Sequence, residues 1–302
     1  MKFHIEPNPW PDVEKHLAEH GHEPAARQDA DFLVFNGTPD QFPELGDNIK
    51  WVQLCLAGID GFFDRGVITA DRRWSNAGGI YGRTVAESAV ALLLAQLHCH
   101  TLVARAKSWN TKQTVDQQTG WLQDKTVAIL GAGGIGRDLI PMLKGFGCHV
   151  IAVNNSGREL PGADQTIAAK DSAPVYAEAD YFILAAPLTP DTHHMINEQT
   201  LAQMQPHAVV INVGRGPLVD TPALVDALRD GRIAGAGLDV TEPEPLPDDH
   251  PLWDFDNVVI TPHEANTQER IRTLIAPAIV ANAAALAAGE RMPTEVDPAK
   301  GY

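Results

Sequence analysis

The chain has 302 residues, 44% of them hydrophobic, and its 39 acidic and 23 basic residues give a formal net charge of -16. This length and apolar content suit two domains with cores of their own and exclude a disordered or fibrous chain. The negative charge disfavours nucleic acid and anionic membranes as partners. The N-terminus has no apolar signal core, and no run approaches the roughly 18 apolar residues of a membrane span. We therefore expect a cytoplasmic protein without a nucleic-acid or membrane partner.

The three cysteines, Cys55, Cys99 and Cys148, form no C-x-x-C pair. We predict buried, reduced thiols rather than a disulfide framework. His98 and His100 flank Cys99, but alternate positions on a helix point to different faces, and no further ligand cluster follows. The sequence therefore predicts no metal site.

The first 97 residues contain short apolar runs separated by turns rich in Pro, Asp and Gly. The runs 32–35 and 51–56 predict strands of a small α/β unit. The stretch 84–95 predicts a long, mostly buried helix, with Thr84 as the candidate N-cap.

Residues 98–286 alternate between apolar runs and longer segments. The runs are rich in Val, Ile and Ala without polar alternation, which is typical of parallel strands covered on both faces by helices. Six such strands predict a doubly wound sheet, and an apolar helix over about 267–288 follows it. The predicted strands are 126–130, 149–153, 181–186, 208–213, 235–240 and 257–262.

The first of these strands ends in a glycine-rich turn. Gly131, Gly133 and Gly136 have G-x-G-x-x-G spacing: the first permits the turn, the second lets a pyrophosphate approach the backbone, and the third lets helix and strand pack closely. Free N–H groups at the start of the next helix would face the phosphates, so Gly134 and Ile135 join the predicted site. We favour dinucleotide binding over the alternative of a plain βα turn.

Charged side chains come just after three of the later strands: Arg215, then Glu242 and Glu244, and finally His263. Ligands of open parallel sheets bind beyond the carboxyl ends of the strands, so we expect these residues at one edge. Each has a simpler explanation alone, as a surface ion pair, a loop acid or a helix cap. Together they can anchor an anionic substrate and move a proton.

Reduction of a 2-keto acid matches this set of residues. Hydride adds to the carbonyl carbon while negative charge grows on the oxygen, which requires a proton donor and a fixed positive charge. His263 suits the first role because its pKa is ordinarily near neutrality and a carboxylate partner keeps it protonated. Arg215 suits the second because its planar guanidinium grips a carboxylate and stays charged.

The chain resembles the D-isomer-specific 2-hydroxyacid dehydrogenase family over nearly its whole length. Several motifs in the right order are far more specific than any one of them. The motifs are the Gly131–Gly136 loop, 184–192 (LAAPLTPDT), 211–220 (INVGRGPLVD), 237–247 (GLDVTEPEPLP) and 261–263 (TPH). The fold that we expect is a doubly wound parallel-sheet (Rossmann) cofactor domain, residues 98–286, inserted into a smaller flavodoxin-like α/β substrate domain, residues 1–97 and 287–302.

The resemblance implies a role for each residue at the sheet edge. Arg215 would be the substrate anchor and His263 the acid/base. Glu244 would be the partner acid of His263, in preference to Glu242, because it lies immediately before the Pro-Leu-Pro stretch.

The resemblance also implies contacts with cofactor and substrate. Asp239 would hold the nicotinamide carboxamide and Pro187 would line the adenosine pocket. Val213 and Gly214 belong to the same predicted cofactor site. The substrate carboxylate would lie in a cradle formed by Ala57, Gly58 and Ile59. A homodimer built on the cofactor domains is implied as well.

The end of the second strand bears on cofactor choice. A dehydrogenase selective for NAD places Asp or Glu there on the ribose hydroxyls, whereas this chain has Asn154. Ser156 and Arg158 follow and can bind a 2′-phosphate. We therefore favour NADP(H), with NAD(H) possible; the alternative is a polar surface turn with an incidental arginine.

The sequence thus predicts an oxidoreductase that transfers hydride between a nicotinamide cofactor and a small 2-keto or 2-hydroxy acid such as glyoxylate or hydroxypyruvate. Glu264-Ala-Asn266 after His263 departs from the small apolar residue and glycines usual in the family, so the substrate stays open. One alternative is a nucleotide-sensing binding protein on the same scaffold, against which Arg215, Glu244 and His263 argue. Another is a formate or phosphite dehydrogenase, and Glu244 is a poor match to formate enzymes.

Overall fold

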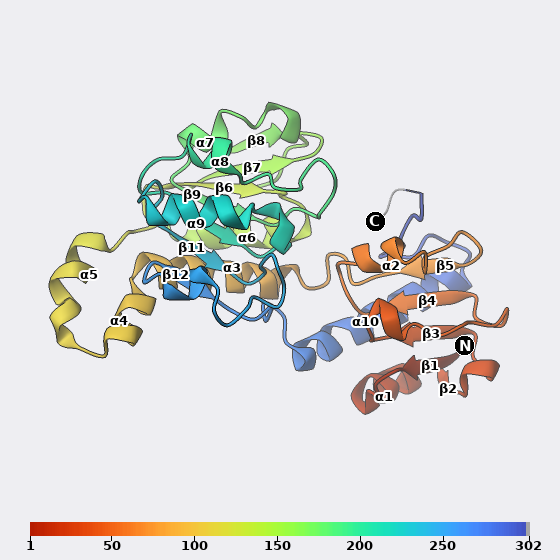
Figure 1. Ribbon diagram of the computed structural model, residues 1–302. Helices are drawn as coiled ribbons and strands as arrows, with labels where there is room; N and C mark the ends of the chain where they lie inside the picture. Colours follow the sequence, from red (N-terminus) through yellow and green to blue (C-terminus); the bar gives the residue numbers. More distant parts are fainter. Residues whose placement is uncertain (300–302) are drawn as a thin grey trace. The chain divides into compact units, whose positions relative to one another are not determined.

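The computed structural model describes residues 1–299 and divides the chain into two compact units (Figure 1). Unit 1 comprises residues 1–81 and the C-terminal segment from Asn266, and unit 2 is Gly82–Ala265. The second unit is therefore an insertion in the first.

The predicted boundaries after residues 97 and 286 are each displaced by one helix. α3 (Gly82–Leu97) belongs to unit 2, because it packs against that unit's sheet, and α10 (Gln268–Ala287) belongs to unit 1, where it packs against α1 (Pro11–Glu19). The helix predicted over 84–95 is present, but it begins at Gly82, so Thr84 lies in its first turn and is not its N-cap.

Unit 1 is built on a five-stranded parallel sheet in the order β2-β1-β3-β4-β5. This order is that of flavodoxin-like folds, which confirms the predicted class of the smaller domain. Only β3 and β4 are predicted from sequence. β2 and β5 are short edge strands, and β1 alternates polar and apolar residues, with only Phe3 fully buried. The strands are β1 (Lys2–Glu6), β2 (Glu23–Pro24), β3 (Phe32–Phe35), β4 (Trp51–Leu54) and β5 (Arg73–Ser75).

The C-terminal segment of unit 1 is fixed to this sheet. The backbone N–H of Val296 donates to the carbonyl of Trp74 at 2.9 Å, and Arg73 on β5 forms a 2.7 Å ion pair with Glu295. The remaining helical segments of this unit are α2 (Asp60–Asp64), η1 (Arg27–Asp29) and η2 (Pro39–Gln41).

α10 is long and apolar enough to cross a membrane by length and composition, and the bent pair α3 and α4 (His100–Ala106) passes the same test. In α10, however, Ile275 and Ile279 are fully buried within unit 1. The buried amide of Asn282 also donates to Gln53 Oε1 on β4 at 2.8 Å. These are the contacts of a core helix.

Unit 2 is built on a seven-stranded parallel sheet in the order β12-β11-β10-β9-β6-β7-β8. From β6 the chain adds strands toward one edge of the sheet, and from β9 it adds strands toward the other edge. This reversal of strand order between β6 and β9 is the doubly wound Rossmann arrangement and confirms the predicted fold. The unpredicted β8 is an edge strand without an apolar run. The strands are β6 (Thr126–Leu130), β7 (His149–Asn154), β8 (Gln165–Ala168), β9 (Tyr181–Leu184), β10 (Val209–Asn212), β11 (Gly235–Leu238) and β12 (Val258–Ile260).

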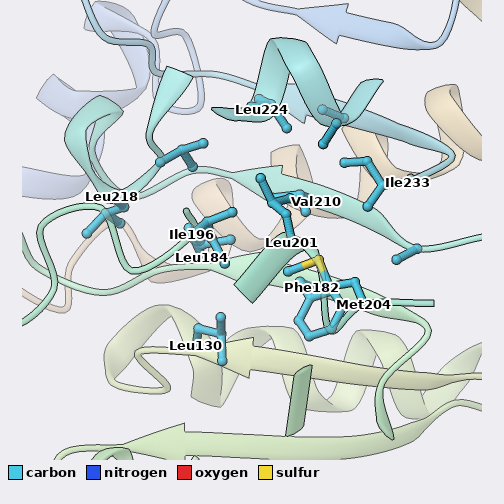
Figure 2. Close-up of a cluster of buried hydrophobic side chains, with 14 of the residues drawn as sticks. Leu130, Phe182, Leu184, Ile196, Leu201, Met204, Val210, Leu218, Leu224 and Ile233 are labelled. Carbon is cyan, nitrogen blue, oxygen red and sulfur yellow. The ribbon is translucent and has the colours of Figure 1, made fainter. Parts of the chain in front are cut away.

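Both faces of this sheet are covered, because successive residues of its strands enter different cores. On β6, Leu130 joins a cluster with Phe182 and Val210 (Figure 2), whereas Ile129 lies in a second cluster that includes residues of α3 and α6 (Gly134–Gly145). The other helical segments are α5 (Lys112–Gln118), α7 (Val175–Glu178), α8 (Glu198–Leu201), α9 (Thr221–Arg229), η3 (Trp109–Thr111), η4 (Ala169–Asp171), η5 (Gly216–Leu218) and η6 (Pro251–Asp254).

The cysteines follow the sequence prediction in part. Cys55 and Cys148 are buried free thiols, and burial raises the pKa of both. Cys99 is a free thiol too, but it is only partly buried at the start of α4.

Candidate active site

The glycine loop between β6 and α6 has a shape that fits a dinucleotide. Gly131 has φ +89°, and a Cβ there would lie 2.3 Å from the Cα of Ala186, so the segment after β9 excludes any side chain. A Cβ on Gly136 would lie 2.9 Å from that of Ala132, which allows close helix packing. At Gly133 the nearest atom would be the Gly131 carbonyl oxygen at 4.0 Å. The loop is therefore open where a pyrophosphate would approach, at the start of α6.

No side chain caps α6, because its N-cap position is Gly133. The first-turn N–H groups, which include those of Gly134 and Ile135, therefore remain suited to an anion. The predicted phosphate-binding residues thus lie in one loop, and the geometry of this loop is suited to binding phosphate.

The loop after β7 is organised by Asn154. Its Nδ2 donates to the Arg158 carbonyl at 2.8 Å, and its Oδ1 accepts from the Arg158 N–H at 3.2 Å and from Ser156 Oγ at 3.3 Å. Gly157 allows the turn with φ +68°. The amide of Asn154 thus shapes the loop, and the side chain of Arg158 is exposed at its end.

The ends of β9 and β10 lie side by side at the middle of the sheet. A Cβ on Gly214 would lie 2.9 Å from the carbonyl oxygen of Ala186, the residue before the exposed Pro187. Val213 is buried, and its N–H donates to the Leu184 carbonyl at 3.1 Å. Pro187, the predicted adenosine contact, and the predicted cofactor residues Val213 and Gly214 therefore lie at adjacent strand ends.

Arg215 is held in a turn by a buried neighbour that the sequence analysis does not single out. The side chain of Asn212, fully buried at the end of β10, donates to the Arg215 carbonyl at 2.8 Å and accepts from the Gly214 N–H at 3.1 Å. Arg215 Nη1 donates to the Gly214 carbonyl at 2.7 Å. Asn212 is the one polar residue of the apolar strand β10, and this pattern could have identified it from the sequence.

His263 and Glu244 form a hydrogen-bonded pair. The distance between His263 Nδ1 and Glu244 Oε1 is 2.6 Å, and about half of the His263 side chain is exposed, at 52%. Because a carboxylate only accepts hydrogen bonds, Nδ1 carries the proton of this bond. Nε2 is then the nitrogen available to a substrate.

The surroundings of this pair favour the protonated form of the imidazole. The hydrogen bond to Glu244 raises the pKa of His263, and the charge of Asp239 adds to this, whereas partial burial and the positive charge of Arg215 oppose it. The same bond lowers the pKa of Glu244, and Arg215 lowers it further. Arg215 therefore lies within electrostatic range of both members of the pair.

Asp239 fixes the turn that carries His263. Its buried carboxylate accepts from Thr261 Oγ1 at 2.6 Å and from the N–H groups of Glu264 and Ala265 at 2.9 and 3.0 Å. His263 has φ +55°, a conformation that a non-glycine residue adopts at a cost, and its N–H donates to the Asp239 carbonyl at 2.8 Å. These bonds occupy the carboxylate of Asp239, which the family resemblance assigns to the nicotinamide carboxamide of the cofactor.

Glu242, the other acid weighed in the sequence analysis, faces a different partner. Its Oε2 lies 2.7 Å from Nε2 of His194, and it makes no recorded contact with His263 in the described chain. Thr241, also absent from the predicted site, is buried and its backbone binds the Glu244 carboxylate.

The predicted substrate cradle of Ala57, Gly58 and Ile59 belongs to unit 1. Arg215 and His263 belong to unit 2. The side chain of Ile59 is buried in the core of unit 1, so the cradle presents backbone rather than that side chain.

Comparison with known proteins agrees with this geometry. Residues 88–265 match the family model described as "D-isomer specific 2-hydroxyacid dehydrogenase, NAD binding domain". A protein of Corynebacterium melassecola, described as "Uncharacterized protein in proB 3'region", is 53% identical over all of both chains. Glyoxylate/hydroxypyruvate reductase B of Pectobacterium carotovorum is 37% identical over 80% of this chain and 75% of its own.

A solved structure is similar over the whole chain. It is an NADPH-dependent glyoxylate/hydroxypyruvate reductase from Sinorhizobium meliloti in complex with NADP and sulfate. The match has a TM-score of 0.83 at 26% identity and covers 100% of this chain and 99% of that one.

Proposed function

We propose, because this chain belongs to the D-isomer specific 2-hydroxyacid dehydrogenase family, that it reduces small 2-keto acids such as glyoxylate or hydroxypyruvate and prefers NADPH. Family membership makes the chain an NAD(P)-dependent oxidoreductase. The identity of the substrate and the preference for NADPH are what we propose beyond family membership.

The observation that carries the proposal is the His263–Glu244 pair beside Arg215, in the same unit as the glycine loop. In this proposal Arg215 binds the carboxylate and keto oxygen of the substrate. The Nε2 of protonated His263 gives its proton to that oxygen as charge develops, and Glu244 stabilises the imidazolium that precedes the transfer.

The bound nicotinamide cofactor supplies the hydride. Gly131, Gly133 and the first turn of α6 would hold its pyrophosphate, and Pro187 would line the adenosine. Asp239 would contact the carboxamide, provided that its carboxylate accepts a further bond besides the three that fix the His263 turn. Ala57, Gly58 and Ile59 would cradle the substrate carboxylate.

A substrate screen tests the activity. Purified protein is assayed for oxidation of NADPH and NADH with glyoxylate, hydroxypyruvate and pyruvate as acceptors. Turnover with a keto acid supports the proposal. Cofactor binding without turnover of any of them would favour the nucleotide-sensing alternative. Reduction of NADP⁺ or NAD⁺ by formate or phosphite, without keto acid turnover, would favour the other rival.

The pH profile should depend on Glu244. Its hydrogen bond raises the pKa of His263, so the proton donor is present below that raised value and is lost as the pH rises through it. Glu244→Gln removes the largest cause of the increase, and we expect the falling limb of kcat/KM for keto acid reduction to move to lower pH. Steady-state rates across pH measure this. An unmoved limb would mean that it does not report His263.

The loop after β7 supports a preference for NADPH. Asn154 removes the negative charge that would repel a 2′-phosphate, and the guanidinium of Arg158 has no hydrogen-bond or ion-pair partner recorded within residues 1–299. A charge-assisted grip on the phosphate is therefore open to it.

Arg158→Ala should raise KM for NADPH and leave KM for NADH nearly unchanged, because only NADPH has the phosphate. The measurement is KM for both cofactors at saturating keto acid. Arg229, which is exposed on α9, supplies a matched control through Arg229→Ala. Equal effects of Arg158→Ala on both cofactors, or a wild-type preference for NADH, would contradict the proposal.

We also propose that the protein acts in the cytoplasm as a homodimer of cofactor units. The segment from α4 through α5 to Trp121 exposes large apolar side chains, with Trp109 91%, Trp121 65% and Val103 41% exposed. Apolar surface of this kind is typical of a protein interface. A second copy is the occupant that the family resemblance favours.

Trp109→Glu should shift the protein from dimer to monomer, because a charge at the centre of an apolar interface is desolvated without a partner. Sedimentation equilibrium over a range of concentrations measures the change. Phe146→Glu is the control, since Phe146 is also partly exposed but lies at the end of α6. A wild-type protein that stays monomeric would exclude the dimer.

A further inference from the structure

A second group of possible ligand atoms lies in unit 2, apart from the His263–Glu244 pair. It consists of His193 and His194, which follow β9, and Glu242, which follows β11. One potential ligand atom from each residue lies within 4.8 Å of the other two. We call these three residues the imidazole cluster. No motif in the sequence marks this cluster, because 48 positions separate His194 from Glu242 and only the fold brings them together.

The fold holds His194 in place from both sides of its peptide. Its N–H donates to the Pro217 carbonyl at 2.8 Å, and its carbonyl accepts from Asn197 Nδ2 at 2.9 Å. His194 has φ +49°, a left-handed conformation that these bonds maintain. Its Nε2 lies 2.7 Å from Glu242 Oε2, and both side chains are about one-third exposed.

His193 is placed to complete a set of ligands. Its ring stacks on that of His194, with centroids 3.9 Å apart and planes 29° apart. Within residues 1–299 no hydrogen-bond partner is recorded for its ring nitrogens, and its side chain is exposed, so the ring can turn toward an ion. The reading without a ligand is a stacked pair with one hydrogen bond to Glu242. That reading gives no role to the nitrogens of His193.

We propose that the imidazole cluster binds one divalent transition-metal ion, with zinc as the best match. Two imidazole nitrogens and a carboxylate oxygen are a common ligand set for zinc, and water would fill the remaining positions. The formal charge of -16 also favours a bound cation.

The ion would link two loops on either side of the turn that carries Arg215. The backbone of Gly216 is packed so closely on Thr241 that a Cβ would lie 1.9 Å from its carbonyl oxygen. The segment after His194 is hydrogen-bonded to the other side of this turn, with Ile196 paired to Val219. A cation shared by His194 and Glu242 therefore cross-links both flanks, and we assign it a structural role.

The test measures binding directly and does not depend on enzymatic activity. Chelator-treated, tag-free protein is titrated with Zn²⁺ by calorimetry and with Co²⁺ by visible absorption, and its thermal unfolding is followed with and without Zn²⁺. We expect one ion per chain at this site, tetrahedral Co²⁺ bands, and a higher melting temperature with metal. His193→Ala and Glu242→Gln should each weaken this binding by about tenfold or more.

His207→Ala is the matched control, because His207 also pairs with a carboxylate, with Nε2 2.5 Å from Asp180 Oδ1, but belongs to no such cluster within residues 1–299. It should bind metal as the wild type does. Absence of metal binding to the wild type, or unchanged binding in His193→Ala, would overturn the proposal. Circular dichroism of each variant ensures that a loss reflects the ligand and not unfolding.

Discussion

Replacement of His263 with alanine is expected to lower the turnover number for keto acid reduction by about two to four powers of ten, the usual contribution of general acid catalysis. The structure supplies the reason. Glu244 holds Nδ1 at 2.6 Å and raises the pKa of the ring, so that Nε2 can deliver a proton near neutral pH. Alanine removes both the proton and its carrier. The glycine loop is left intact, so cofactor affinity should barely change.

Pre-steady-state and steady-state rates with the best keto acid measure the loss, and fluorescence titration measures cofactor binding. His207→Ala is the control, since it removes an imidazole with a carboxylate partner elsewhere in unit 2. A His263→Ala variant with near-normal turnover would remove His263 from the mechanism. Equal losses of turnover and cofactor affinity would instead point to a disturbed turn around Asp239.

Much of the fold could be predicted because its strands are continuous apolar runs. β6 illustrates this: Ile129 and Leu130 point into different cores, so both had to be apolar, and the run has no polar alternation. β8 gave no such signal, because it lies at the edge of the sheet and its residues are exposed or only partly buried. Local pattern thus identifies central strands and misses edges.

The domain boundaries were harder to predict because they depend on which sheet a helix covers. α3 and α10 are both largely apolar helices at a junction, and apolar content does not say which core they enter. α3 packs on β10 and β11, and α10 on α1. Only long-range contacts could have assigned them to their units.

The candidate site was predictable where a strand end fixes a position. Arg215, Glu244 and His263 each follow a strand, and parallel strands end at one edge of the sheet. The residues that orient them were not predictable in the same way. Asn212 and Asp239 act through bonds to backbone groups of a turn, and such bonds leave no spacing in the sequence.

Replacement of Arg215 with glutamine is expected to lower kcat/KM for the keto acid by about a hundredfold to a thousandfold, as for the loss of one group that stabilises developing negative charge. Glutamine keeps some hydrogen-bonding capacity but loses the positive charge that reaches Glu244 and His263. Arg215→Lys keeps the charge and loses the two-pronged grip, so it should fall between glutamine and the wild type. Steady-state kinetics with the keto acid as the varied substrate give these values.

The order of the two variants separates charge from geometry. If charge alone matters, Arg215→Lys should retain nearly full activity; a loss of less than about threefold, under one kcal/mol, would mean that the bidentate grip contributes little. If the grip matters, lysine should lose more than that. Arg229→Gln is the control, because Arg229 pairs with Asp226 on the exposed side of α9. An Arg215→Gln variant as active as this control would show that the substrate is anchored elsewhere, because glutamine cannot replace the positive charge of Arg215.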